Sequence, residues 1–130
     1  MQKVIYLADD DNETKNILKL FLENSGYEVD AFENGELLLD RFNEKPSDMV
    51  ILDIMMPGKD GLEICNILRK QSSVPIIMLT AKDSELDYIN GIINGCDDYL
   101  VKPFRPTILL MKIKAIFRRI EMDSQNLNLY

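Results

Sequence analysis

The stretch MVILD, residues 49–53, decides the fold of this chain, because an unbroken apolar run is followed directly by an aspartate. A continuous apolar run of this length is typical of a strand that is covered on both faces, as strands are in parallel sheets. We predict a strand over 49–52 on this basis. Comparable β-branched and aromatic runs predict further strands at 3–8, 27–32, 76–79 and 99–101.

Apolar residues at helical spacing occupy the segments between these strands. They predict helices over 12–24, 35–43, 60–70, 84–94 and 106–120. Strands that alternate with helices favour an α/β fold, a doubly wound parallel sheet with helices on both faces. The 130 residues suffice for one such core, which we place at 1–121. We expect 122–130 to be a polar tail, or the start of a linker to an output domain absent from this chain.

Composition excludes several classes of function. The net charge of −7 argues against a nucleic-acid-binding surface, which needs to be basic. The chain has no histidine, so histidine-based metal sites and Ser-His triads are excluded. No signal peptide or apolar run of membrane-spanning length is present, and the two cysteines form no disulfide scaffold. We therefore expect a cytoplasmic protein without a membrane partner.

Polar residues follow the predicted strands at the points where those strands end. Asp9 and Asp10 follow the first strand, Asp53 the third, Thr80 the fourth and Lys102 the fifth. In open α/β sheets, ligands bind beyond the carboxyl ends of the strands. We therefore expect three carboxylates, a hydroxyl and an ammonium to converge at one edge of the sheet.

Such a set of groups suits phosphoryl chemistry. Three neighbouring carboxylates repel one another, and a hard cation such as Mg²⁺ or Mn²⁺ relieves the repulsion. A carboxylate beside a metal and an ammonium can act as a nucleophile toward phosphorus. Other interpretations remain open: the acids at 9–11 could form a solvated turn that caps a helix, and Lys102 could be a surface lysine.

Four motifs resemble the receiver domain of bacterial two-component response regulators: LADDD (7–11), MVILDIMMPGKDG (49–61), PIIMLTAK (75–82) and GCDDYLVKPF (95–104). The resemblance implies a flavodoxin-like (βα)5 fold with strand order 2-1-3-4-5. It also implies a regulatory domain rather than an enzyme, one that could phosphorylate itself from small donors and dephosphorylate itself. The phosphoryl group would come from a sensor histidine kinase.

The same resemblance assigns roles to individual residues. Asp53 would accept the phosphoryl group, beside Lys102. Thr80 and Tyr99 would form the conformational switch, and the small Ala81 would leave room for the phosphoryl group. The implied metal ligands are Asp9, Asp10, Asp53 and the main-chain carbonyl of Met55.

The last predicted helix, PTILLMKIKAIFRRI, resembles that of OmpR/PhoB-type transcriptional regulators. Its first apolar stripe suffices to dock the helix and contains Leu109, Ile113, Ile116, Phe117 and Ile120. Its second stripe, Ile108, Met111 and Ala115, suggests a partner, although a broad core-facing stripe would look the same. Residues 83–98 carry five acids and no base, and residues 105–120 carry five bases and no acid.

The resemblance to these regulators implies a two-fold homodimer that forms on phosphorylation through the helix 84–94, the strand 99–101 and the helix 106–120, and the second stripe and the opposite charges agree with it. The residues expected on this face are Asp97, Asp98, Ile108, Met111, Lys112 and Arg118. DNA would be bound only by an output domain outside this chain. The alternative is a stand-alone receiver that relays phosphate or docks on a protein target.

Two other classes fit the sequence less well. An aspartate-based phosphohydrolase needs a second catalytic aspartate close after the first, and Asp53 is followed by Ile54 and Met55. A flavin-binding module needs a phosphate loop after the first strand, where this chain has three acids.

Overall fold

A computed structural model describes residues 2–81 and 94–128 of the chain, and the predicted helix 84–94 lies outside this part except for Asn94. It contains one five-stranded sheet in the order β2-β1-β3-β4-β5, and all four pairs of neighbouring strands are parallel. The strands are β1 Val4–Ala8, β2 Glu28–Phe32, β3 Met49–Asp53, β4 Ile76–Thr80 and β5 Asp98–Val101. The predicted fold class and strand order are confirmed.

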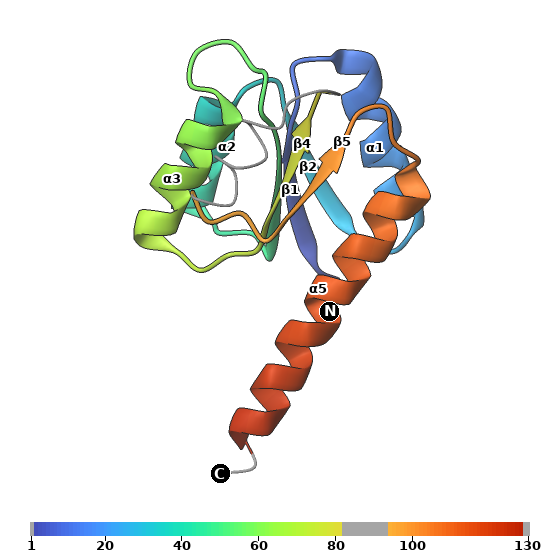
Figure 1. Cartoon of the computed structure of the whole chain (residues 1–130), viewed down its shortest axis with the longest axis vertical. Coiled ribbons are helices and arrows are strands. Elements are labelled where there is room, and N and C mark those ends of the chain that lie inside the picture. Colours follow the sequence, from blue (N-terminus) through green and yellow to red (C-terminus); the bar gives the residue numbers. More distant parts are fainter. Residues whose placement is uncertain (1, 82–93, 129–130) are drawn as a thin grey trace.

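Helices cover both faces of the sheet (Figure 1). One side carries α2 Gly35–Glu44 and α3 Gly61–Gln71, and the other carries α1 Asn12–Asn24 and α5 Pro106–Asn128. Alternate residues of β3 serve the two sides: Val50 and Leu52 pack toward α2 and α3, whereas Met49 and Ile51 pack toward α1 and α5. All four are fully buried. The continuous apolar run is thus explained by a strand with a core on each face.

The end of α5 differs from the prediction. The helix continues to Asn128, so the predicted end at 120 was too early. Residues 121–128 contain neither glycine nor proline, so no local signal stops the helix. Figure 1 shows α5 extending beyond the body of the domain. For this reason Ile120, predicted to face the core, is 44% exposed.

None of the helices among the described residues is both long enough and apolar enough to cross a membrane.

The direction of the strands defines one edge of the sheet. All five strands run in the same direction, so their carboxyl ends lie together, opposite the end from which α5 projects (Figure 1).

Candidate functional site

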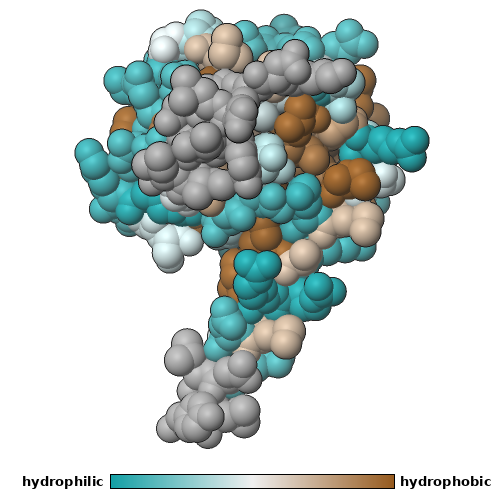
Figure 2. All heavy atoms as spheres, viewed as in Figure 1, coloured by the Kyte–Doolittle hydropathy of each residue, from teal (hydrophilic) through white to brown (hydrophobic). Residues whose placement is uncertain are grey.

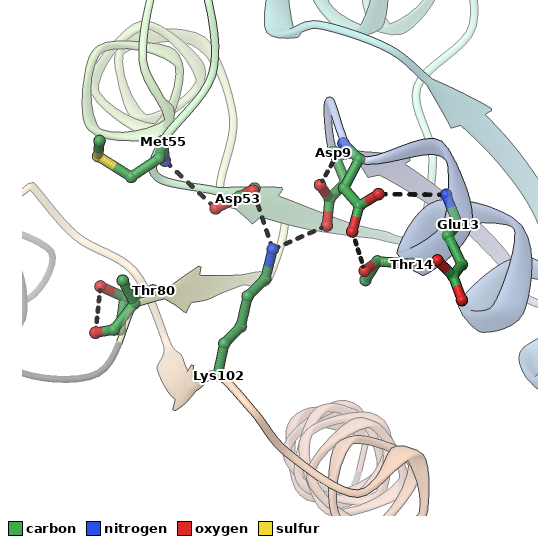
Figure 3. Close-up of polar contacts among 9 residues, drawn as sticks. Asp9, Glu13, Thr14, Asp53, Met55, Thr80 and Lys102 are labelled. Carbon is green, nitrogen blue, oxygen red and sulfur yellow. Dashed lines mark hydrogen bonds and ion pairs between the residues drawn. The ribbon is translucent and has the colours of Figure 1, made fainter.

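Three charged side chains from the ends of three strands meet at this edge (Figure 3). Lys102 Nζ lies 3.0 Å from Asp53 Oδ2 and 3.1 Å from Asp9 Oδ2. Asp9 directly follows β1, Asp53 is the last residue of β3, and Lys102 directly follows β5. The peptide bond between Lys102 and Pro103 is cis. The convergence expected from the strand ends is therefore present in the structure.

The carboxylates also form a group of the kind that binds a divalent cation. Asp9, Asp10 and Asp53 each offer an oxygen, and these oxygens lie within 4.8 Å of one another. Asp9 is fully buried and Asp53 is 4% exposed, whereas Asp10 lies at the surface. Buried carboxylates need a compensating charge, and an all-oxygen set that includes a solvent-facing member suits Mg²⁺. The residues present therefore fit the ion.

The environment shifts the proton affinities of the central pair. Burial raises the pKa of Asp53 to about 6, the hydrogen bond from Lys102 opposes that shift, and the charge of Asp9 adds to it. Burial lowers the pKa of Lys102, but its hydrogen bond with Asp53 and the negative charges of Asp53 and Asp9 outweigh this, and the net shift is upward. Lys102 therefore remains an ammonium ion that partly neutralises two buried acids.

Two contacts fix the backbone around Asp53. Its Oδ1 accepts a hydrogen bond of 3.2 Å from the main-chain N–H of Met55. Gly61, at the start of α3, packs directly against the end of β3. A Cβ atom at position 61 would lie 2.5 Å from the carbonyl oxygen of Asp53 and 2.9 Å from Ile54 Cα. This close approach was not predicted from the sequence.

The acidic triplet 9–11 divides into two functions. Asp9 Oδ1 accepts a hydrogen bond of 3.0 Å from the backbone of Asp11, which holds the loop in place. Asp11 is the N-cap of α1, with its carboxylate accepting hydrogen bonds from Glu13 N and Thr14 Oγ1. The hydrogen bond from Thr14 lowers the pKa of Asp11. The capping interpretation thus holds for Asp11, and its place just before the helix is the sequence signal for it.

The other predicted site residues lie beside this centre. Thr80 is 1% exposed, and its hydroxyl lies 3.5 Å from the carbonyl oxygen of Ala81. Figure 3 shows Thr80 at the end of β4, away from the carboxylate of Asp53. Tyr99 on β5 is half-buried and packs against the core cluster on the α2 and α3 side. Met55 is 65% exposed at the rim.

A pocket of about 510 Å³ adjoins the site between α1 and the segment that follows β5. Its lining is mainly apolar, with one end at Lys102. The lining residues are Thr14, Ile17, Leu18, Ala81, Lys102, Pro103, Phe104 and Pro106. Ile17 is 52% exposed, so part of this apolar lining is open to solvent.

The predicted dimer face is only partly as expected. Ile108 and Met111 are 41% and 65% exposed, and Arg118 is exposed. The acids of this face are engaged within the chain, since Asp98 Oδ2 lies 3.0 Å from Lys112 Nζ and Asp97 Oδ2 lies 2.7 Å from Arg69 Nη2. The pairing of these acids within the chain was not predicted from the sequence.

Comparisons with known proteins agree with this architecture. The family model for the response regulator receiver domain matches residues 5–114. The chain is 40% identical over 120 residues to the transcriptional regulatory protein ResD of Bacillus subtilis, a match that covers 92% of this chain and 50% of ResD. The chain thus spans about half the length of that relative.

Solved structures show the same fold. A two-component response regulator from Clostridium difficile is 33% identical with a TM-score of 0.87, covering 92% of this chain and 98% of the other. A putative response regulator from Chloroflexus aurantiacus is 35% identical with a TM-score of 0.84, covering 89% and 98%. The fold, the grouped acids at the strand ends and the match along most of the sequence lead to one conclusion: the chain belongs to the response regulator receiver domain family.

Proposed function

We propose that this receiver domain accepts a phosphoryl group on Asp53, and that the modification controls an output function in transcription. The observation that carries the proposal is the contact of Lys102 Nζ with both Asp53 and Asp9, at 3.0 and 3.1 Å. It places a positive charge against a buried carboxylate, and Lys102 itself also lines the neighbouring pocket. Such an arrangement stabilises the negative charge of a phosphoryl group in transfer.

In the proposed reaction an oxygen of Asp53 attacks phosphorus while the bond from phosphorus to the donor breaks. The product is an acyl phosphate, and the donor leaves with the electron pair of the broken bond. Asp9, Asp10 and Asp53, with the carbonyl of Met55, would hold Mg²⁺, which when bound supplies further positive charge to the phosphoryl oxygens. Lys102 would turn from the carboxylate of Asp53 toward the new phosphoryl group.

The donor histidine would have to lie outside this chain, because the chain contains none. The apolar pocket that ends at Lys102 offers a partner surface next to Asp53. This supports a sensor histidine kinase as the donor, docked so that its histidine reaches the carboxylate. Thr80 and Tyr99, which lie on neighbouring strands, would then respond to the modified Asp53 by changing their side-chain positions.

Dimerisation through β5 and α5 is the proposed output. Figure 2 shows hydrophobic residues on the α5 side of the molecule, among hydrophilic ones. Val101, Ile108, Met111 and Met122 are exposed apolar residues of these two elements. Asp97, Asp98, Lys112 and Arg118 would form the charged margin of the face. Control of transcription is supported by the similarity to ResD, which is named as a transcriptional regulatory protein and is about twice as long.

The chemistry can be tested with a small phosphodonor such as acetyl phosphate, in the presence of Mg²⁺, with intact mass as the readout. We expect a gain of one phosphate, no gain with EDTA, and no gain for Asp53→Asn. Asp40→Asn, which removes an exposed carboxylate on α2, serves as the matched control and should react like the unmodified chain. A gain that survives Asp53→Asn would disprove the proposal.

A further inference from the structure

Lys102 directly follows β5, so the position of this strand places Lys102 in the site. The sequence of β5 by itself defines that position only weakly. It is an edge strand that pairs only with β4 in the described sheet. Tyr99 packs toward the α2 and α3 side and Leu100 toward the α1 and α5 side, so both faces are apolar. The centre of the strand, Tyr99 and Leu100, therefore gives no polar alternation that would define the register, and Asp98, which pairs with Lys112 of α5, is the only charged residue of β5.

The site is sensitive to that register. A slip of one residue moves the end of a strand by about 3.3 Å and turns each side chain to the opposite face. Lys102 Nζ now lies 3.0 Å from Asp53 and 3.1 Å from Asp9. A displacement of that size would remove the ammonium from both carboxylates. Some other contact must therefore define where β5 begins.

Arg69 on α3 makes this contact. Its Nη1 donates to the carbonyl of Val74 at 2.6 Å, just before β4. Its Nε donates to the carbonyl of Gly95 at 2.7 Å, just before β5. Its Nη2 donates to Asp97 Oδ2 at 2.7 Å. One planar guanidinium thus joins the segments that lead into two neighbouring strands, with the fixed geometry that its fork of donors provides.

Asp97 completes the link between the two strands. The same Oδ2 atom accepts a hydrogen bond of 2.7 Å from the backbone N–H of Ile76, the first residue of β4. Asp97 N donates to Ile76 O at 2.8 Å, so side chain and backbone hold the same pairing. Gly95 makes room for the link: its φ is +95°, and a Cβ there would lie 3.0 Å from Arg69 Cγ.

We propose that Arg69 is a positioning residue for the phosphoryl site, acting through the register of β5 on the position of Lys102. The inference rests on the proposed phosphorylation of Asp53. Arg69 touches neither carboxylate, so it is not a catalytic residue. The contacts of Arg69 and Asp97 fix the start of β5, and the hydrogen bond of 2.7 Å from Lys102 N to Thr80 O fixes its end.

The test measures phosphorylation of Asp53 from a small donor in Arg69→Met and in Asp97→Asn, using the full chain. We expect Arg69→Met to slow the reaction by about tenfold, because small misplacements of a catalytic group have effects of this order. Asp97→Asn keeps an oxygen acceptor and should slow it less. Arg41→Met, which removes a guanidinium that pairs on the surface of α2, is the matched control and should leave the rate unchanged.

Two further measurements separate positioning from a loss of structure. If Arg69 acts through Lys102, adding Arg69→Met to Lys102→Ala will cause no further slowing. Mg²⁺ affinity, measured by titration, should be unchanged or tighter in Arg69→Met, because the ammonium that competes for the carboxylates has moved away. A general loosening of the site would weaken Mg²⁺ binding instead.

Three results would overturn the inference: an unchanged rate in Arg69→Met, additive slowing in the Lys102→Ala background, or weaker Mg²⁺ binding. If Arg69→Met does not fold, Asp97→Asn is combined with Lys102→Ala in its place, and the same three results overturn the inference. Failure of the proposed function is a different result, because there the unmodified chain itself gains no phosphate on Asp53.

Discussion

The ammonium group of Lys102 contacts two acids, and these contacts determine the charge balance of the site. Asp9 and Asp53 both contact its ammonium group, and one positive charge cannot fully compensate two buried negative ones. A bound divalent cation would neutralise the remaining negative charge. Burial, with a smaller contribution from the charge of Asp9, makes Asp53 costly to ionise when no metal is bound, as its raised pKa of about 6 indicates.

This cost predicts a pH-dependent difference in stability between the metal-free chain and Asp53→Asn. The pKa of Asp53 is 3.8 ordinarily and about 6 in the fold, so the folded state binds the proton more tightly. Stability conferred by the protonated group is therefore lost as pH rises between these values. At pH 7 in EDTA, Asp53→Asn should be more stable by on the order of 2 kcal/mol, after allowance for solvent screening.

Denaturant unfolding at pH 4 and pH 7 measures this difference. We expect the two proteins to be close in stability at pH 4 and to diverge by pH 7. Added Mg²⁺ should stabilise the unmodified chain and reduce the gap. If the difference in stability between the two proteins is the same at pH 4 and pH 7, the raised pKa does not belong to Asp53.

Gly61 yields a second prediction at the scale of a residue. The Cβ of Gly61→Ala would press on the carbonyl of Asp53, and overpacking of this kind costs about 1–3 kcal/mol. Because the end of β3 has to move, phosphorylation of Asp53 should slow as well. Gly35→Ala is a suitable control, since its Cβ would meet only the side chain of Ile64. It should lower stability without slowing phosphorylation, and equal slowing in both would refute a specific role for Gly61.

Among the described elements, α5 has exposed apolar side chains that the proposed dimer would cover. Leu109, Ile113 and Ile116 dock it on the sheet, whereas Met111 on another side of the helix is 65% exposed. We expect Met111→Glu to weaken dimerisation of the phosphorylated chain by at least about tenfold, because a charge at the centre of an apolar interface must be desolvated. Sedimentation equilibrium provides the measurement.

The control for this experiment is Asn66→Glu, which adds the same charge at an exposed position of α3. It should dimerise like the unmodified chain. Dimerisation that is equally strong in Met111→Glu would show that the interface lies elsewhere.

Many of the elements, and part of the site, could be predicted from the sequence. Strand positions followed from apolar runs such as 49–52, and the meeting of Asp9, Asp53 and Lys102 followed from the rule for parallel strand ends. The contact of Arg69 with Asp97 could not be predicted, because a long-range pair of common charged residues leaves no periodic signal. The length of α5 was missed for a related reason: polar residues at 121–125 suit both an exposed helix and an irregular tail.

At the scale of the whole molecule, the parallel sheet brings distant parts of the chain to one edge. The acids come from the first half of the sequence, while Lys102 arrives on an edge strand whose start is fixed by α3. The site and the exposed face of α5 are therefore linked through β5. Under the proposed function, a change at Asp53 would reach that face through β5.

Asp53 is the proposed phosphoacceptor. The most direct test of this proposal is to locate the modified residue. The chain is incubated with a phosphodonor and Mg²⁺, the acyl phosphate is reduced with borohydride, and peptides are mapped by mass spectrometry. We predict a single reduced residue, at position 53. Reduction at Asp9, Asp10 or any other acid, with Asp53 intact, would contradict the account.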